Sequence, residues 1–438
     1  MSDPPSVFFN AEAVRGRTAR ELYVGITIER DAVIPPLSHS HCRCFGFILP
    51  GAACPPTQVC AKQNQSQITS SVRIRKVMSV IANLSALLAT LQEIEGFAST
   101  ALEELQPLEV KGLAHDHVEV KGRNLLLRVP KQSQFAMAAA ENLNYQAACF
   151  RRVGQSGHAP SLKAVIAPSE SVPMGALLVE QINGRPPSLP QDLGALAECM
   201  ARVHALPVPG KTQRPPLGDH ANPVAGAMKE IEQQAEFLDE AALSSESRQE
   251  IEAELAWARP FAAETQGQSQ PQTLVLTDTH PGNFLIDPEG RAIIVDLEKA
   301  LYGSPATDLA HATIYSSTTW DTDVYADLSI DEVAGFYRRY LETVPEELAE
   351  TLRPWMLPLR RITMLRAVTW CAKWRVVQSR SKTENKHSAA STEDWSAENN
   401  TSDLIAHVAG RVDEYLQAKT LRRMRAEWLG PASLRAFF

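Results

Sequence analysis

The chain has 438 residues and a formal net charge of −8, with hydrophobic and charged fractions of 44% and 21%. These fractions are close to globular averages, which excludes a collagen-like, a wholly disordered or a disulfide-scaffold protein. The negative net charge provides no basic field for nucleic acid or for an anionic membrane, so we expect neither as a partner. The length suffices for two or three ordinary domains.

The first 77 residues differ from the rest of the chain. Residues 1–77 carry nine Lys and Arg against five Asp and Glu, a net charge of +4, which leaves −12 for residues 78–438. They also hold four cysteines: Cys42, Cys44, Cys54 and Cys60. The single residue between Cys42 and Cys44 is too short a gap for a zinc knuckle. We therefore predict a disordered extension, or a segment that precedes a true start at Met78.

The remaining cysteines and the apolar pattern after Met78 indicate in which cell compartment the protein is expected. Cys149, Cys199 and Cys371 are scattered singly, as in reduced cytosolic proteins, and the N-terminus lacks the pattern of a secretory signal. The apolar pattern from Met78 to Leu91 is interrupted by polar residues and falls short of the ~20 residues that cross a bilayer. We predict a cytoplasmic protein without a membrane span.

Residues 78–182 predict a small lobe of mixed α+β character. In chain order, the patterns indicate helices to about Leu105, strands over 117–120 and 124–129, a helix over 135–153, and strands over 161–167 and 176–181. The two short strands are joined by a Lys-Gly-Arg turn, which is typical of a hairpin. We expect a small mixed β-sheet with leading helices.

Residues 183–438 are mainly helical in pattern. The predicted helices cover 193–206, 224–241, 247–265, 330–342, 359–378 and 402–427. Pro354 and Pro358 are expected to break any helix between 346 and 359. A β-rich insert at 273–276, 283–286 and 292–295 predicts a hairpin over 273–296, and the polar stretch 381–400 predicts a mobile loop.

This insert places three oxygen-bearing side chains at the ends of apolar strands. Asp278 and Asn283 are five residues apart across a Pro-Gly turn, and Asp296 ends the next apolar run. Phosphoryl transfer from a nucleotide requires one carboxylate at the acceptor hydroxyl and a small ligand set for Mg²⁺ on the phosphates. The plain alternative is a hairpin with a polar turn, which the combined spacing disfavours.

At these residues the sequence resembles the aminoglycoside phosphotransferase and choline kinase family. Residues 276–283 read L-T-D-T-H-P-G-N, similar to the family's H-G-D-x-H-P-x-N, and residues 295–298 read V-D-L-E, similar to its I-D-W/F-E/D. Residues 303–310 read G-S-P-A-T-D-L-A, similar to its G-D-P-x-x-D-L-A. The resemblance covers roughly residues 105–376. It implies an α+β, two-lobed, protein-kinase-like fold with a small β-sheet lobe and a mainly helical lobe.

The resemblance also implies roles for the residues of this motif. Asp278 is the catalytic base or the group that orients the acceptor hydroxyl, and His280 braces the catalytic loop. Asn283 and Asp296 are ligands of Mg²⁺ on a bound ATP. Asp308 is a scaffold residue that binds the catalytic loop.

Glu298 remains open between two interpretations. By the resemblance it reaches a second metal or the acceptor. From the sequence it is equally a surface acid paired with the adjacent Lys299.

The small lobe departs from the family pattern at several positions. Arg128 stands where the family has a lysine that clamps the α- and β-phosphates, and Arg neutralises phosphate as well. The expected acid on the following helix is replaced by Gln146, and Glu141 is the nearest alternative. The phosphate loop offers a single glycine, Gly112, and Glu180 would contribute only backbone atoms to an adenine-binding hinge.

The acceptor is expected to be a small molecule with a hydroxyl group and an amine. Candidate lining residues are acids and aromatics: Trp320, Asp321, Asp323, Trp370 and Trp374. Trp370 and Trp374 lie four residues apart and form either an aromatic cage for an amine or part of the core. The leading hypothesis is an ATP-dependent, Mg²⁺-dependent kinase of this acceptor.

Two alternatives remain. A nucleotide-binding module without catalysis is suggested by Leu276, Gln146 and the single glycine, which depart from the family pattern. A protein kinase is less favoured, because no A-P-E segment follows Asp296. The sequence does not indicate an oligomeric state.

Overall fold

The computed structural model describes residues 84–108, 114–131, 133, 135, 137–384, 402–431 and 433–438. The chain divides into two units, Met1–Arg73 and Ile74–Phe438, and every described residue belongs to the second. The predicted extension over residues 1–77, with its four cysteines, lies outside the described residues. So do Gly112 and residues 385–401, which include most of the predicted loop 381–400.

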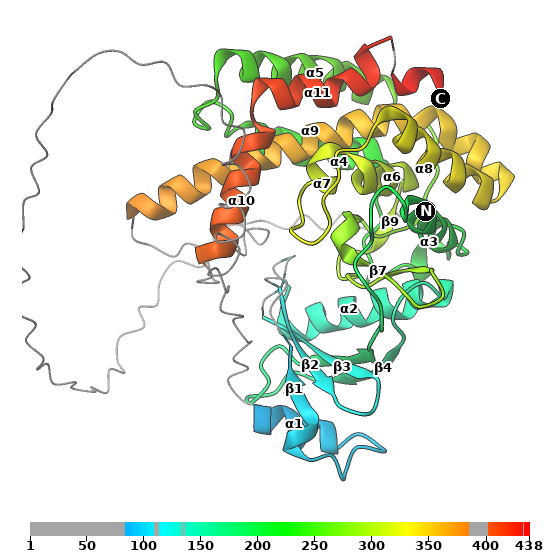
Figure 1. Ribbon diagram of the computed structural model, residues 1–438, viewed down its shortest axis with the longest axis vertical. Helices are drawn as coiled ribbons and strands as arrows, with labels where there is room; N and C mark the ends of the chain where they lie inside the picture. Colours follow the sequence, from blue (N-terminus) through cyan, green and yellow to red (C-terminus); the bar gives the residue numbers. More distant parts are fainter. Residues whose placement is uncertain are drawn as a thin grey trace, which may run out of the picture. The chain divides into compact units, whose positions relative to one another are not determined.

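The small lobe is built on a five-stranded sheet with the order β1-β2-β3-β5-β4 (Figure 1). The strands are β1 (Leu105–Pro107), β2 (His115–Val120), β3 (Leu125–Pro130), β4 (Leu162–Ile166) and β5 (Ala176–Glu180). Its helices are α1 (Leu84–Gln92) and α2 (Ala139–Val153). The predicted helix to about Leu105 therefore ends early, and the chain turns at Gly96, whose φ of 86° lies in the left-handed region.

The expectation of a mixed sheet is wrong, because all four strand pairings are antiparallel. A helical crossover from β3 through α2 to β4 would make these two strands parallel neighbours. Instead β5 lies between them and pairs with both. Its run of apolar residues is explained by burial on two faces: Leu178 packs in the cluster that contains α1, whereas Leu177 and Val179 pack in the cluster that contains α2.

The larger lobe is mainly helical, as predicted. Its helices are α3 (Leu193–His204), α4 (Pro223–Ala235), α5 (Ser245–Glu264), α6 (Pro305–Thr313), α7 (Tyr315–Thr318), α8 (Ile330–Thr343), α9 (Glu346–Glu384), α10 (Ser402–Tyr415) and α11 (Ala418–Leu429). The predicted helix over 402–427 is thus two helices. Among the described residues, no helix has the length and apolar character needed to cross a membrane.

The β-rich insert forms two small sheets in place of one hairpin over 273–296. Strand β6 (Thr273–Val275) pairs with β9 (Leu301–Gly303), and β7 (Phe284–Ile286) pairs with β8 (Ala292–Ile294). A short 3-10 turn over Pro281–Asn283 separates β6 from β7 and directs them into different sheets. The loop between β6 and β7 and the segment between β8 and β9 carry the predicted site residues.

Helix α9 continues through both Pro354 and Pro358, so the predicted break is wrong. Each proline removes one backbone hydrogen bond from a helix interior, at a cost of about 3 kcal/mol. The helix persists because it packs against α4, α6 and α8 and buries Leu352, Met356 and Leu359 along this stretch. Tertiary packing therefore outweighs the local preference to end the helix.

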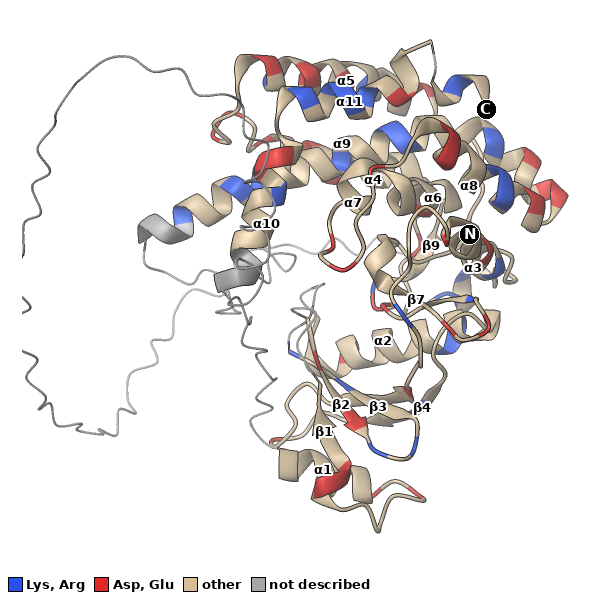
Figure 2. Ribbon diagram, viewed as in Figure 1, with Lys and Arg blue, Asp and Glu red and all other residues tan. Residues whose placement is uncertain are grey.

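Charged side chains join α11 to α5, which lie side by side (Figure 2). Arg422 binds Glu250 at 2.7 Å, and Arg425 binds the buried Glu254 at 2.8 Å. Arg361 of α9 reaches Glu254 from the other side at 3.1 Å. These pairs fix the C-terminal helix on the helical lobe that carries the site.

Replacing Pro354 with Ala is expected to stabilise the protein. Pro354 is exposed, and alanine restores a backbone donor within α9. Removing the proline from the helix interior should stabilise the folded state by about 3 kcal/mol. The more flexible unfolded chain of the variant offsets up to about 1 kcal/mol of this. The free energy of unfolding, measured by chemical denaturation, should therefore rise by about 2 kcal/mol. The control Pro345→Ala, just before the helix, should give no such gain. Destabilisation by Pro354→Ala would contradict this account of α9.

Candidate active site

The loop that carries Asp278 begins where β6 ends, and one buried aspartate holds its start. Asp308 lies in the first turn of α6 with no exposed surface. Its carboxylate accepts hydrogen bonds from the backbone N–H groups of Leu276 at 2.6 Å and Thr277 at 2.8 Å, and His204 Nε2 lies 3.1 Å away. The scaffold role predicted for Asp308 is confirmed by these contacts.

Two threonines fix the loop further. Thr277 has a φ of 64°, a left-handed conformation that is uncommon for a residue with a branched side chain. Its hydroxyl donates to Lys299 O at 3.0 Å, which ties the loop to the segment after Asp296. Thr279 donates through Oγ1 to Asp308 O at 2.7 Å, and through its N–H to His311 Nδ1 at 3.1 Å. The residue between them, Asp278, is therefore presented by a loop anchored on both sides.

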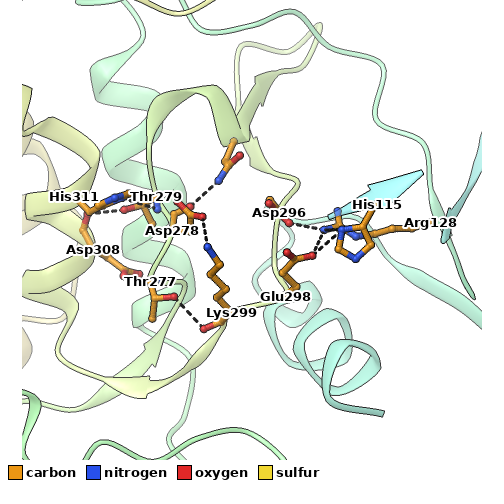
Figure 3. Close-up of polar contacts among 11 residues, drawn as sticks. His115, Arg128, Thr277, Asp278, Thr279, Asp296, Glu298, Lys299, Asp308 and His311 are labelled. Carbon is orange, nitrogen blue, oxygen red and sulfur yellow. Dashed lines mark hydrogen bonds and ion pairs between the residues drawn. The ribbon is translucent and has the colours of Figure 1, made fainter. Parts of the chain in front are cut away.

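The carboxylate of Asp278 is paired with Lys299. Lys299 Nζ lies 2.9 Å from Asp278 Oδ2 (Figure 3). Burial raises the pKa of the Asp278 carboxyl, but the electrostatic interaction with Lys299, together with those of His280 and His311 and the hydrogen bond from Lys299, outweighs burial and lowers this pKa well below its usual range. Asp278 is thus held ionised and can accept a hydrogen bond from an incoming hydroxyl group.

Asn283 is hydrogen-bonded through its backbone to Val295, the residue before Asp296. Asn283 Nδ2 donates to Asp278 O at 2.9 Å, and Val295 N donates to Asn283 O at 2.9 Å. These bonds use the amide nitrogen of the side chain and leave its carbonyl oxygen for a cation. One amide oxygen and one carboxylate suit Mg²⁺ on a nucleotide, because Mg²⁺ takes few protein ligands and completes its shell with phosphates and water.

Within the described residues there is no cluster of three or more His, Cys, Asp or Glu arranged to hold a metal ion. A Mg²⁺ site of one Asn and one Asp does not require such a cluster. The residues present therefore fit a nucleotide-bound Mg²⁺ and do not fit a zinc-type site.

Arg128 of β3 lies at the centre of a buried ion cluster. Its guanidinium donates to the carboxylates of Asp296 and Glu298, the latter at 2.6 Å (Figure 3). It also donates to Val295 O at 3.3 Å. Burial lowers the pKa of Arg128, but the Asp296 and Glu298 carboxylates more than offset this effect and raise the pKa. Its Nε is buried and has no hydrogen-bond partner. A charged donor is therefore left beside the predicted metal ligand.

The predicted helix partners of Arg128 are not its direct contacts. Glu141 is exposed on α2, and Gln146 is buried but contacts His115 Nε2 at 3.2 Å. His115 Nδ1 in turn lies 3.2 Å from Arg128 and 2.9 Å from Glu298 Oε2. Of the two helix residues that the sequence left open as partners, neither contacts Arg128 directly, because Glu298 and Asp296 supply the negative charge.

Glu298 is buried, with 3% of its surface exposed, so its interpretation as a surface acid is wrong. Burial raises the pKa of Glu298, but His115 and Arg128 outweigh this effect and lower the pKa well below its usual range. Burial and the nearby Glu298 charge raise the pKa of Asp296. A second-metal role for Glu298 stays a prediction.

Sequence reasoning missed His115. His115 and His117 lie two residues apart in β2, and His117 lies opposite Arg128 on β3. This spacing is the one sequence signal that could have indicated His115. A single histidine in a strand is too common a feature to be chosen on that basis.

The hinge residue Glu180 is tied to the sheet. Its Oε2 accepts from Ser161 Oγ at 2.8 Å, and its N–H donates to Ser161 O at 2.9 Å. The side chain is therefore engaged within the small lobe, in keeping with a contribution through main-chain atoms only.

A cavity of about 330 Å³ opens on the other side of Asp278. Trp320 and Trp370 line it, with ring centroids 6.0 Å apart and planes at 73°. Trp374 belongs to the hydrophobic core, so it does not form a cage with Trp370. Asp321 and Asp323 are not among the described residues that line the cavity.

His280 lines the cavity, and its Nδ1 atom is buried without a hydrogen-bond partner.

The profile of the phosphotransferase enzyme family matches residues 104–351. The chain belongs to this family. Family membership confirms the resemblance and the α+β two-lobed fold predicted from the sequence. No curated protein matches the chain.

Several solved structures are similar to this phosphotransferase family member. A choline/ethanolamine kinase family protein from Mesorhizobium loti is 16% identical, with 80% of this chain and 97% of that chain covered and a TM-score of 0.48. An ethanolamine kinase from Plasmodium vivax is 13% identical, with 77% and 89% covered and a TM-score of 0.48. An aminoglycoside phosphotransferase from Streptomyces rimosus is 17% identical, with 64% and 98% covered and a TM-score of 0.40.

Replacing Asp308 with Asn is expected to destabilise the protein. An amide group there turns one acceptor into a donor that faces a backbone N–H, and it removes the charge that strengthens both bonds. The free energy of unfolding should fall by about 2 kcal/mol in chemical denaturation. The exposed control Asp331→Asn should change this free energy by less than about 0.5 kcal/mol. If Asp308→Asn and Asp331→Asn change the free energy of unfolding by the same small amount, Asp308 does not anchor the loop.

Proposed function

We propose that this protein is an ATP-dependent kinase that transfers the γ-phosphate to a hydroxyl group of a small molecule. The observation that supports this most strongly is the position of Asp278. Its half-buried, ionised carboxylate borders the cavity. The Asn283 side chain binds the Asp278 backbone, and the Asn283 backbone binds Val295, the residue before Asp296. An acceptor in the cavity and a nucleotide at the ion cluster would then meet at this carboxylate.

Asp278 is suited to orient the acceptor hydroxyl group. Its lowered pKa makes the carboxylate a weak proton acceptor but an effective hydrogen-bond acceptor. In a loose phosphoryl-transfer transition state, positioning the hydroxyl oxygen in line with the γ-phosphate provides most of the catalysis. Lys299 holds the carboxylate in place at 2.9 Å.

Asn283 and Asp296 would hold Mg²⁺, which when bound neutralises charge on the transferring phosphates. Arg128 adds a second positive charge at the same place. Its guanidinium pairs with Asp296, which is also a predicted ligand of the metal. The same guanidinium also contacts Glu298 and His115. We infer that Glu298 keeps Arg128 oriented when a nucleotide and its metal engage Asp296.

A nucleotide-binding module without transfer is the second candidate. It is favoured by one observation, the direct ion pair between Arg128 and the metal ligand Asp296. If a bound nucleotide leaves this pair intact, Mg²⁺ lacks a carboxylate and transfer fails. Binding of ATP without ADP formation from any acceptor would favour this candidate.

We retain a cytoplasmic location as a prediction. It is supported by Cys149, Cys199 and Cys371, which are buried free thiols.

Replacing Asp278 with Asn tests the kinase proposal. A panel of small hydroxyl compounds is first screened for ADP formation with the wild-type chain. With the best acceptor, Asp278→Asn should lower kcat by at least about 100-fold, because the hydroxyl loses its charged orienting group. The dissociation constant of Mg-ATP, measured by calorimetry, should change by less than about threefold, which is under 1 kcal/mol.

The control for this experiment is Glu289→Gln in the exposed turn between β7 and β8. It should leave both kcat and the dissociation constant unchanged. ADP formation that persists in Asp278→Asn would contradict the proposal.

A further inference from the structure

The charged side chains that line the cavity beside Asp278 neutralise one another. The acids are Asp278 and Glu230, and the bases are Lys299 and Arg366. Asp278 pairs with Lys299 at 2.9 Å, and Glu230 pairs with Arg366 at 2.7 Å. Among the described residues that line the cavity, both carboxylates therefore already face a cation.

Three histidines also line this cavity, and none supplies negative charge. Burial lowers the pKa of His220, and burial lowers the pKa of His311 to about 4, so both rings are neutral at neutral pH. A proton on the third ring, His280, would add only positive charge. The cavity is thus unfavourable for an ammonium group, because a buried cation without a free carboxylate is strongly disfavoured.

The rest of the lining combines apolar walls with unused hydroxyl groups. Trp320 and Trp370 form one wall, and Ile362 is another apolar lining residue. Ser304 and Ser316 line the cavity with 2% and 8% of their surface exposed, and the Oγ atoms of both are buried without a hydrogen-bond partner. Buried hydroxyl groups are normally satisfied, so these two are available to bind polar groups of a ligand.

The cavity has the volume of a small-molecule site. About 330 Å³ is at the lower end of the range of roughly 300–1,000 Å³ for such sites. A compact ring compound fits this space.

We propose that the acceptor is an uncharged, compact ring compound that carries hydroxyl groups. This inference rests on the proposed kinase function and departs from the amine-bearing acceptor expected from the sequence. In the reaction, the acceptor hydroxyl oxygen forms a bond to the γ-phosphorus of ATP, the bond from that phosphorus to the β–γ bridging oxygen breaks, ADP leaves, and the hydroxyl proton is released. The ring face packs on Trp320 and Trp370, and the remaining hydroxyl groups bind Ser304 and Ser316.

Three probes with the same ring and different charge test this proposal on the full chain. They are trans-1,2-cyclohexanediol, trans-2-aminocyclohexanol and 2-hydroxycyclohexanecarboxylate, which are neutral, cationic and anionic at neutral pH. Binding is measured by saturation-transfer NMR with the nonhydrolysable analogue of ATP and Mg²⁺ present, and ADP formation is measured with ATP. The diol should bind at least about tenfold more tightly than the ammonium or the carboxylate compound.

A variant that changes the charge balance provides the second measurement. Arg366→Gln removes the cation paired with Glu230 and should shift the preference toward the ammonium probe by at least about tenfold. The matched control is Arg259→Gln, which removes the exposed partner of Glu232. It should leave the order of the three probes unchanged.

The outcomes separate this inference from the proposed function. Equal or tighter binding of the ammonium or the carboxylate probe to the wild-type chain overturns the inference, as does the absence of diol binding. Diol binding without ADP formation from any acceptor supports the inference about the cavity and overturns the proposed kinase function. Tight diol binding together with ADP formation supports both.

Discussion

The buried guanidinium of Arg128 is the constraint on which the arrangement of this site depends. A buried cation must be paired, and here the pairing groups come from separate parts of the chain. Asp296 and Glu298 follow β8, His115 lies on β2, and Gln146 reaches the cluster from α2 through His115. One buried charge therefore fixes the small-lobe sheet, its helix and the predicted metal-binding segment with respect to one another.

The same segment also organises the acceptor side of the site. Glu298 and Lys299 are adjacent, yet the first contacts Arg128 and the second contacts Asp278 (Figure 3). Asp308 independently holds the loop that carries Asp278. Two ion-paired centres, one at Arg128 and one at Asp278, are thus joined by two consecutive residues. The proposed function assigns the phosphates to the first centre and the acceptor hydroxyl group to the second.

Much of this site was accessible from sequence, because local spacing carries the relevant chemistry. Asp278 and Asn283 share one tight turn, and the apolar strands around them leave few other arrangements. The partner of Arg128 was not accessible, since a contact across 170 residues depends on tertiary packing that no spacing encodes. The two prolines of α9 show the same limit, because packing against α4, α6 and α8 overrides a strong local signal.

The net charge of the chain says little about the charge of the acceptor. Residues 78–438 carry a net charge of −12. In the structure the two described acids that line the cavity, Glu230 and Asp278, are matched by Arg366 and Lys299 at short distance. Ligand charge preference follows from the groups that face the ligand, and distant surface acids are screened by solvent and salt.

The most direct test asks which of two acids, Glu298 or Glu141, supports Arg128 in nucleotide binding. Calorimetry of Mg-ATP binding to Glu298→Gln and to the matched variant Glu141→Gln compares the buried contact with the exposed helix acid. The account predicts that Glu298→Gln weakens binding by at least about tenfold, because Arg128 loses its orienting counter-ion, and that Glu141→Gln leaves the affinity unchanged. Weakened binding in Glu141→Gln together with unchanged binding in Glu298→Gln would contradict it.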